Sequence, residues 1–170
     1  LERARELAME ADVLIENFRP GVMEGFGLAY EDLRAGNPRL VYCSITGFGS
    51  GDGASLTGYD LLVQALGGLM SITGEADGDH QKVGVALVDV LTGLFATTGI
   101  LTAVRHRDAT GEGQLVQVDL FSSLLASLVN HQVRLASRPV GLPTSACWQL
   151  TQEALSPPTP GGVLVKVLAL

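Results

Sequence analysis

A long apolar segment, residues 83–120, constrains the fold of this chain more than any other feature. It opens with an apolar run carrying one acid, Asp89, continues as a helical pattern over residues 90–107, and ends in a glycine-rich turn and a short alternating strand. The helical part, about 18 residues and roughly 27 Å long, lies within a segment of membrane-spanning length. Because it also carries Asp89, glycines and hydroxyl side chains, we expect a core helix of a globular domain instead.

The composition predicts one globular domain. The chain has 170 residues, 46% of them hydrophobic and 17% charged, which is enough for a core. Its net charge of −7 argues against nucleic acid as a partner. Cys43 and Cys147 make neither a disulfide framework nor a metal site, so we expect a reducing, cytoplasmic location, no metal and no membrane. Since Leu1 is not methionine and no signal peptide is recognisable, we expect a fragment of a longer protein.

Helical and strand patterns alternate along residues 1–135, which we predict to form one partial domain. Helices are expected at 1–10, 21–27, 30–35, 59–70, 90–107 and 120–135, and strands at 11–15, 39–45 and 114–119. This alternation is typical of an α/β fold in which helices cover a parallel sheet. From residue 136 prolines interrupt the pattern, and we expect residues 136–170 to be a poorly ordered tail.

The loop after the first predicted strand offers an amide, an aromatic ring and a guanidinium in Asn17, Phe18 and Arg19. Open parallel sheets bind ligands beyond the carboxyl ends of their strands. Phe18 could stack on a purine and Arg19 could pair with a phosphate. The same residues could equally form only a turn before a helix that Pro20 starts. The glycine-rich loop at 46–53 has the spacing of neither a dinucleotide site nor a P-loop.

Acids stand at the starts of two predicted helices. Asp60, in the first turn of one helix, could simply complement the helix dipole. Asp89, before the long helix, is either an N-cap or a nucleophile, because a helix N-terminus favours the ionised carboxylate in both roles. The basic residues Arg105, His106 and Arg107 fall in the last turn of the long helix, where cations suit the dipole.

Several stretches, taken in order, resemble the class III CoA-transferases, the family of carnitine, formyl-CoA and glutarate CoA-transferases. The stretches are DVLIENFRPG at 12–21, NPRL at 37–40, SITGFG at 44–49, GYD at 58–60, SITG at 71–74, VD at 88–89 through Gly93, and residues 107–114. The resemblance runs from Leu1 to about Gln132. It implies part of a Rossmann-like large domain, an interlocked homodimer at full length, coenzyme A thioesters as substrates and no permanently bound cofactor.

The resemblance also implies roles for single residues. Asp89 would be the nucleophile, forming an aspartyl anhydride and then an aspartyl-CoA thioester while coenzyme A moves between carboxylic acids. The positions that resemble the coenzyme A and acyl site are Asn17, Phe18, Arg19, Tyr59 and Asp60. Two positions depart from the pattern: Gly25 replaces a common basic residue, and Thr57 stands where formyl-CoA transferase carries lysine.

Two alternatives stay open beside the transferase. α-Methylacyl-CoA racemase shares this fold and the acid at Asp89, but has histidine at the position of Tyr59. Because tyrosine, with a pKa of about 10, is a poor base at neutral pH, Tyr59 favours a transferase. The other alternative is a truncated, non-catalytic remnant that binds coenzyme A weakly or associates with a partner chain.

Overall fold

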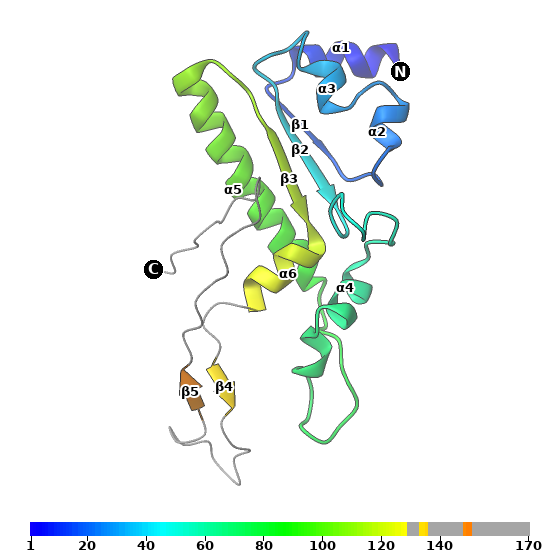
Figure 1. The fold of residues 1–170 in the computed structure, drawn as a ribbon, viewed down its shortest axis with the longest axis vertical. Helices are drawn as coiled ribbons and strands as arrows, with labels where there is room; N and C mark the ends of the chain where they lie inside the picture. Colours follow the sequence, from blue (N-terminus) through cyan, green and yellow to red (C-terminus); the bar gives the residue numbers. More distant parts are fainter. Residues whose placement is uncertain (129–132, 136–147, 151–170) are drawn as a thin grey trace. The chain divides into compact units, whose positions relative to one another are not determined.

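The computed structural model describes residues 1–128 in full and the backbone of two short strands beyond them, β4 (Val133–Leu135) and β5 (Trp148–Leu150), which pair antiparallel. Residues 1–128 and 129–170 form separate compact units. The elements of the first unit (Figure 1) are α1 (Glu2–Glu10), β1 (Val13–Glu16), α2 (Val22–Gly25), α3 (Tyr30–Leu33), β2 (Val41–Thr46), α4 (Asp60–Leu66), η1 (Leu69–Ser71), α5 (Leu87–Thr110), β3 (Leu115–Asp119) and α6 (Leu120–Leu128).

The predicted helix over residues 120–135 is wrong at residues 133–135. Helix α6 is described over Leu120–Leu128, whereas the backbone of Val133–Leu135 is a strand paired with Trp148–Leu150; the residues between them lie outside the described part of the chain. Valine and leucine fit either structure, so the apolar pattern alone did not mark the change. The tail at residues 136–170, predicted to be poorly ordered, lies outside the described part of the chain apart from β5. Cys147 also lies outside it.

The described residues build a parallel sheet in the order β1-β2-β3. Val13 pairs with Val41, and Tyr42 pairs with Leu115. The middle strand β2 is buried on both faces, and Val41, Tyr42 and Cys43 are at most 2% exposed. A strand covered on both sides needs a continuous apolar run instead of alternation, and RLVYCSI supplies it. The predicted α/β class with a parallel sheet is confirmed.

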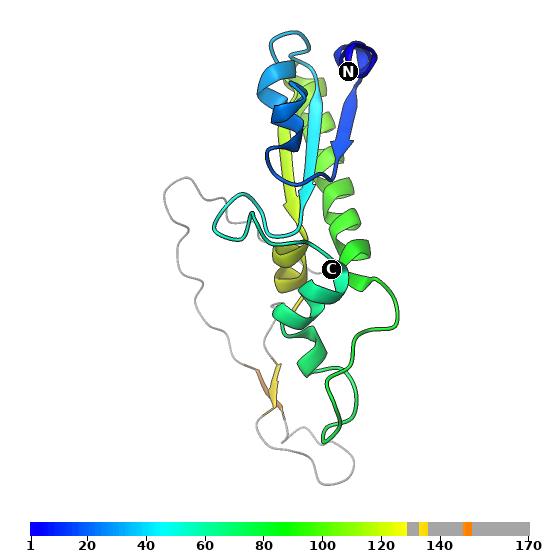
Figure 2. The same ribbon diagram turned by 90° about the vertical axis from the view of Figure 1, so that its right-hand side faces the viewer.

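Helix α5 lies along one face of this sheet, and α2 and α3 lie on the other (Figure 2). The buried stripe of α5 consists of Val88, Thr92, Ala96, Ala103 and Arg107. At Gly99 the helix backbone comes so near β3 that an added Cβ would lie 2.7 Å from Val116 Cγ1. The absence of a side chain at Gly99 therefore allows α5 to pack directly on the strand.

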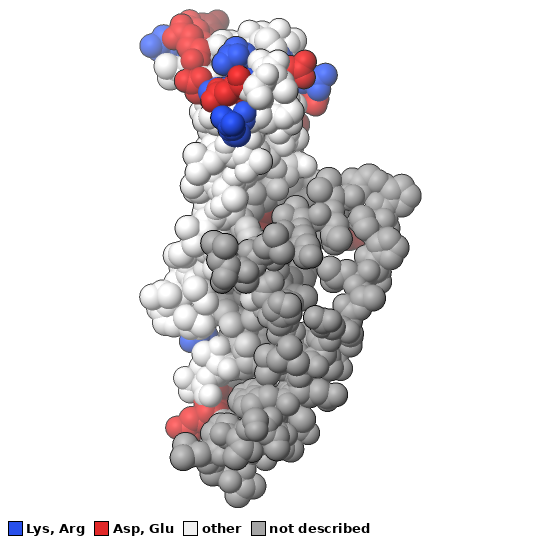
Figure 3. All heavy atoms as spheres, turned by 90° about the vertical axis from the view of Figure 1, so that its left-hand side faces the viewer, with Lys and Arg blue, Asp and Glu red and all other residues white. Residues whose placement is uncertain are grey.

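The opposite side of α5 is exposed, although the sequence predicted a core helix. Val90, Leu94 and Leu101 are 57%, 61% and 64% exposed. The reason is that, within the described residues, only the sheet side of α5 is covered. Among the described atoms visible in Figure 3, uncharged ones predominate below a charged end. By length and composition alone α5 could cross a membrane, a test that core helices of soluble proteins also pass.

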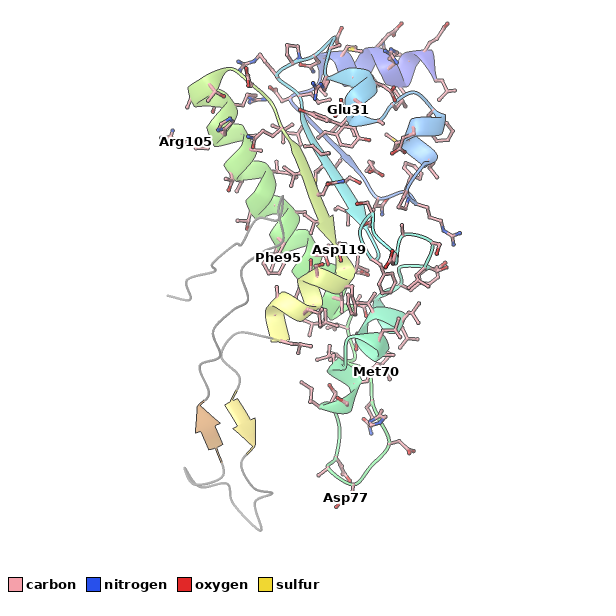
Figure 4. All side chains as sticks on the ribbon, viewed as in Figure 1. Glu31, Met70, Asp77, Phe95, Arg105 and Asp119 are labelled. Carbon is pink, nitrogen blue, oxygen red and sulfur yellow. The ribbon has the colours of Figure 1, made fainter. Side chains whose placement is uncertain are left out.

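The C-terminal end of α5 is anchored by Arg107, which is 7% exposed. Its Nη1 donates to the Asp12 carboxylate at 2.8 Å and to the Asp12 carbonyl at 3.4 Å, just before β1. Gly111 then ends the helix in the left-handed conformation, φ 86°. Of the predicted basic cluster, Arg105 points outward (Figure 4), whereas Arg107 ties two distant segments together.

Two apolar clusters fix the ends of the sheet. One, between β2 and the N-terminal helices, contains Ala8, Met23, Leu28, Leu33, Leu40 and Tyr42. The other lies near the carboxyl ends of the strands, between α4, α5 and α6, and contains Val63, Leu69, Val88, Leu120 and Leu124. Strand β3 runs into α6 without a connecting residue, and the Asp119 carboxylate, marked in Figure 4, accepts the Ser122 amide hydrogen at 2.7 Å. The second cluster supports the candidate site.

Candidate active site

A cavity of about 530 Å³ lies beyond the carboxyl ends of β1 and β2, where ligands bind in open α/β sheets. Four parts of the chain line it: the loop after β1, the end of β2 with the segment that leads into α4, the first turns of α5, and the start of α6. All six residues that the sequence singled out are in its lining: Asn17, Phe18, Arg19, Tyr59, Asp60 and Asp89. The fold thus brings together residues that are up to about seventy positions apart in the sequence.

The loop after β1 presents Phe18 and Arg19 to the cavity. The Phe18 amide donates to Glu16 Oε2 at 2.8 Å, and the Phe18 ring is 51% exposed. Arg19 Nη2 donates to Thr57 Oγ1 at 3.4 Å. Thr57 therefore orients the Arg19 guanidinium at this side of the cavity. The helix α2 begins at Val22 after Gly21 in the left-handed conformation, so the prediction that Pro20 starts this helix is wrong.

A contact between two glycine backbones fixes the second wall. A Cβ at Gly58 would overlap with Gly47 Cα and lie 3.0 Å from the Gly47 nitrogen. The end of β2 and the residues leading into α4 touch there without side chains between them. Gly58 is followed at once by Tyr59, which is 68% exposed, and by Asp60. The two glycines therefore allow these backbone segments to pack in direct contact.

Asp60 links the start of α4 to the start of α5. Its Oδ1 accepts the amide hydrogens of Val88 at 2.7 Å and Asp89 at 3.2 Å. Its Oδ2 accepts from Gln64 Nε2 at 2.5 Å. The first amides of a helix lack partners within the helix, so Asp60 acts as a cap for α5 although it belongs to another helix.

Asp89 lies in the first turn of α5, which begins at Leu87 and has Ala86 in the N-cap position. The prediction that Asp89 precedes the helix is wrong, and so is the alternative that it serves as the N-cap. Its side chain is exposed to the cavity. Burial and, secondarily, the negative charge of Asp60 raise the pKa of the Asp89 carboxyl above its ordinary value of 3.8. A carboxylate with a raised pKa is a stronger base, and hence a better nucleophile once it is ionised.

The sequence reasoning missed two residues that shape the site, Gln64 and Thr92, and noted Thr57 only as a departure from the family pattern. Thr92 lines the cavity one helical turn after Asp89, and its hydroxyl donates to the Val88 carbonyl at 2.7 Å. Gln64 is fully buried beneath Asp60. The signal for Gln64 was available, since it follows Asp60 by four residues and shares its face of α4.

A second cavity, of about 550 Å³, opens on the face of the sheet that carries Tyr42. Its lining contains five carboxylates and one cationic side chain, that of Arg19. The five acids are Glu16, Glu24, Glu31, Asp32 and Asp119. This acidic lining would repel phosphates, so the cavity at Asp89 suits a nucleotide better. Among the residues that the structure describes, no cluster of three or more histidine, cysteine, aspartate or glutamate side chains could hold a metal ion.

Comparison with known proteins decides the family. The family model of CoA-transferase family III matches residues 1–144 of the chain. The chain belongs to this family. The match includes every residue singled out at the cavity. It confirms the resemblance inferred from the ordered motifs.

Characterised family members are similar to much of this chain. The succinate–glutarate CoA-transferase of Agrobacterium fabrum is 45% identical over 138 residues, which are 79% of this chain and 34% of that protein. The acetyl-CoA:oxalate CoA-transferase of Acetobacter aceti is 46% identical over 151 residues, or 88% and 36% of the two chains. The chain spans about a third of the length of these relatives.

The fold agrees with solved structures of the family. A CAIB/BAIF family protein from Brucella suis superposes with a TM-score of 0.73 at 47% identity, over 76% of this chain and 35% of that one. The Rv3272 protein of Mycobacterium tuberculosis superposes with a TM-score of 0.71 at 35% identity, over 76% and 37%. The structure therefore represents part of the family III fold.

Proposed function

We propose that this chain carries the nucleophile and part of the coenzyme A site of an enzyme that moves coenzyme A between carboxylic acids. The observation that carries the proposal is the position of Asp89. It stands in the first turn of α5, in a cavity that also gathers Phe18, Arg19 and Tyr59. An acid with a raised pKa at a helix N-terminus is suited to attack a thioester.

In the proposed reaction the ionised Asp89 carboxylate attacks the acyl carbon of an acyl-CoA. The carbon–sulfur bond breaks, coenzyme A leaves as a thiolate, and a mixed anhydride remains. The thiolate then attacks the aspartyl carbonyl carbon, which forms an aspartyl-CoA thioester and releases the first acid as its carboxylate. The acceptor carboxylate runs the same steps in reverse and regenerates the free Asp89 carboxylate. Each step exchanges one acyl bond for another, so no net proton, electron or water is consumed.

The other cavity residues have roles in this scheme. Phe18 offers an exposed ring on which the adenine of coenzyme A can stack. The Arg19 guanidinium, oriented by Thr57, pairs with a phosphate. Tyr59 and Asn17 stand at the same cavity as hydrogen-bonding groups for the thioester and pantetheine amides. Asp60 has a structural role in this scheme, because both of its carboxylate oxygens already accept hydrogen bonds from other residues of the chain.

The acids exchanged are proposed to be dicarboxylates. Relatives named for succinate, glutarate and oxalate support this choice.

We propose further that the full-length protein is a cytoplasmic homodimer without a resident cofactor. The exposed apolar side of α5 supports association. Cys43, a buried free thiol whose pKa is raised by burial, is consistent with a reducing compartment.

The test is intact-mass spectrometry of the chain after incubation with succinyl-CoA and other acyl-CoA esters. The parent chain should gain a covalent adduct, and Asp89→Ala should gain none. Arg19→Gln should still form the adduct but require about tenfold more acyl-CoA, because one charge-assisted hydrogen bond is lost. If neither the parent nor the Asp89 variant is labelled, the proposal fails for this chain. If both are labelled, another residue is the nucleophile.

A further inference from the structure

A buried amide stands behind the proposed nucleophile. Gln64 is 0% exposed, although an amide side chain is costly to bury without partners. Its Nε2 donates to Asp60 Oδ2 at 2.5 Å, and its Oε1 accepts the Val83 amide hydrogen at 2.9 Å. Gln64 therefore connects α4 to the segment that leads into α5.

We propose that Gln64 is a positioning residue, whose amide holds Asp60 and the segment before α5 in place and so sets the position of Asp89. The part of this inference that concerns Asp89 as the nucleophile rests on the proposed function. The part that concerns the structure, that Gln64 holds the start of α5 in place, rests on the hydrogen bonds alone.

The hydrogen bonds form a chain whose donors converge from both sides on the Asp60 carboxylate. Val83 donates to Gln64, Gln64 donates to Asp60, and Asp60 accepts two further bonds from the first turn of α5. Only a side chain with an acceptor at one end and a donor at the other fits between a backbone N–H and a carboxylate. The ends of the chain are Val83 and Asp89, the two sides of the turn that enters α5.

Val83 and Leu87 also pack against the apolar cluster at this entry. Residues 74–82, in the loop between η1 and α5, are exposed, and Asp77 marks the tip of this loop in Figure 4. Val88, by contrast, is fully buried in the apolar cluster, and its amide donates to Asp60. Without Gln64, Asp60 would keep its place only through α4. Its carboxylate could then rotate away from the Val88 and Asp89 amides.

The test compares three variants by hydrogen exchange at the Val88 amide and by the rate of adduct formation with succinyl-CoA. Gln64→Met keeps the length of the side chain but removes both bonds. Gln64→Glu keeps the size, and its carboxyl group, protonated because of burial beside Asp60, can donate to Asp60 and accept from Val83. Tyr42→Phe is the matched control, because it removes one buried hydrogen bond, to the Leu28 carbonyl, in the other apolar cluster.

In Gln64→Met we expect exchange at Val88 to accelerate at least about tenfold and the adduct rate to fall by about as much, with the affinity for free coenzyme A within about twofold of the parent. Gln64→Glu should stay near the parent in all three measurements, and Tyr42→Phe should leave Val88 exchange unchanged. Parental exchange at Val88 in Gln64→Met would overturn the inference. Equal acceleration in Tyr42→Phe would do so too, because the effect would then be general destabilisation. If the parent forms no adduct, the proposed function fails, while exchange at Val88 still decides the role of Gln64.

Discussion

Replacing Gly58 by alanine tests how tightly the site is held. An alanine Cβ at this position would overlap with Gly47 Cα and lie 3.0 Å from the Gly47 nitrogen. Both neighbours are backbone atoms, so no side chain can rotate aside. Since non-bonded carbon atoms rest roughly 3.5–4.0 Å apart, one of the two segments must move by about 1 Å.

The expected cost follows from this displacement. Forcing a methyl group into a packed region typically costs about 1–3 kcal/mol. For chains of roughly this length, each kcal/mol lowers the melting temperature by about 2–4 °C, so Gly58→Ala should melt about 2–12 °C below the parent. The effect on the reaction should be larger, because Gly58 precedes Tyr59 and Asp60 directly. A misplacement of about 1 Å at a reacting group can cost about a hundredfold in rate.

Gly51→Ala is the control, because Gly51 lies in the same glycine-rich loop and its added Cβ would have no atom within 4 Å. The two variants and the parent are compared by thermal denaturation followed by circular dichroism and by the rate of adduct formation. Gly51→Ala should melt about 1–4 °C above the parent, since replacing a glycine at an unstrained position stabilises the fold by about 0.4–1 kcal/mol. Equal melting temperatures and rates for the two variants would refute the argument that the contact between Gly47 and Gly58 is rigid.

Two further predictions concern charge. Because the pKa of the Asp89 carboxyl is raised in the folded chain, the ionised carboxylate disfavours folding. Asp89→Asn should therefore raise the melting temperature slightly at pH 7. This gain should vanish below the ordinary pKa of 3.8, where the carboxyl is protonated in the folded and unfolded chain alike. Over the same range the adduct rate of the parent should fall as the pH drops through the raised pKa of Asp89, and a gain in stability that persists at pH 3 would contradict the reasoning. Arg107→Met should lower the free energy of unfolding, measured by urea titration, by about 1–3 kcal/mol. Asp12→Asn should lower it by less than about 1 kcal/mol, because the Asp12 side chain is 82% exposed. A larger effect of Asp12→Asn would show that the charge of Asp12, and not the buried guanidinium, stabilises this end of α5.

Local patterns were sufficient to predict the order of the elements. Apolar runs placed β1 and β2 within a few residues, and alternation placed β3; the continuous apolar signature of a strand buried on both faces is found in β2. The long helix was recognisable from its period and from the glycine after it, although it starts at Leu87 and not at Val90. The loop that contains Asn17 was placed at the site because it follows the carboxyl end of a strand, whereas Tyr59 and Asp89 were assigned to the site through the family resemblance.

Other features depend on contacts between distant residues and left no local pattern. Asp60 was interpreted through its own helix, but it caps α5, 28 positions later in the chain. Arg107 was interpreted as a favourable charge for the helix dipole, but it pairs with Asp12, 95 positions earlier. The exposed side of α5 was predicted to be buried, since an apolar composition does not say which neighbours cover a helix. All of these differences have the same cause. The residues that contact Asp60, Arg107 and the outer side of α5 are determined by the tertiary fold, which local sequence patterns do not show.

The direct passage from β3 into α6 determines which parts of the site can move. Leu120 lines the cavity and begins α6 immediately after Asp119, while the Phe121 amide donates to the Gly47 carbonyl at 3.1 Å. With no connecting residue to act as a hinge, this side of the cavity must move together with the sheet. The opposite rim includes Gly49 and Thr57, which lie in the segment between β2 and α4 and not at a direct strand-to-helix junction. An inhibitor built against the α6 side would therefore bind a surface whose shape is set by the sheet.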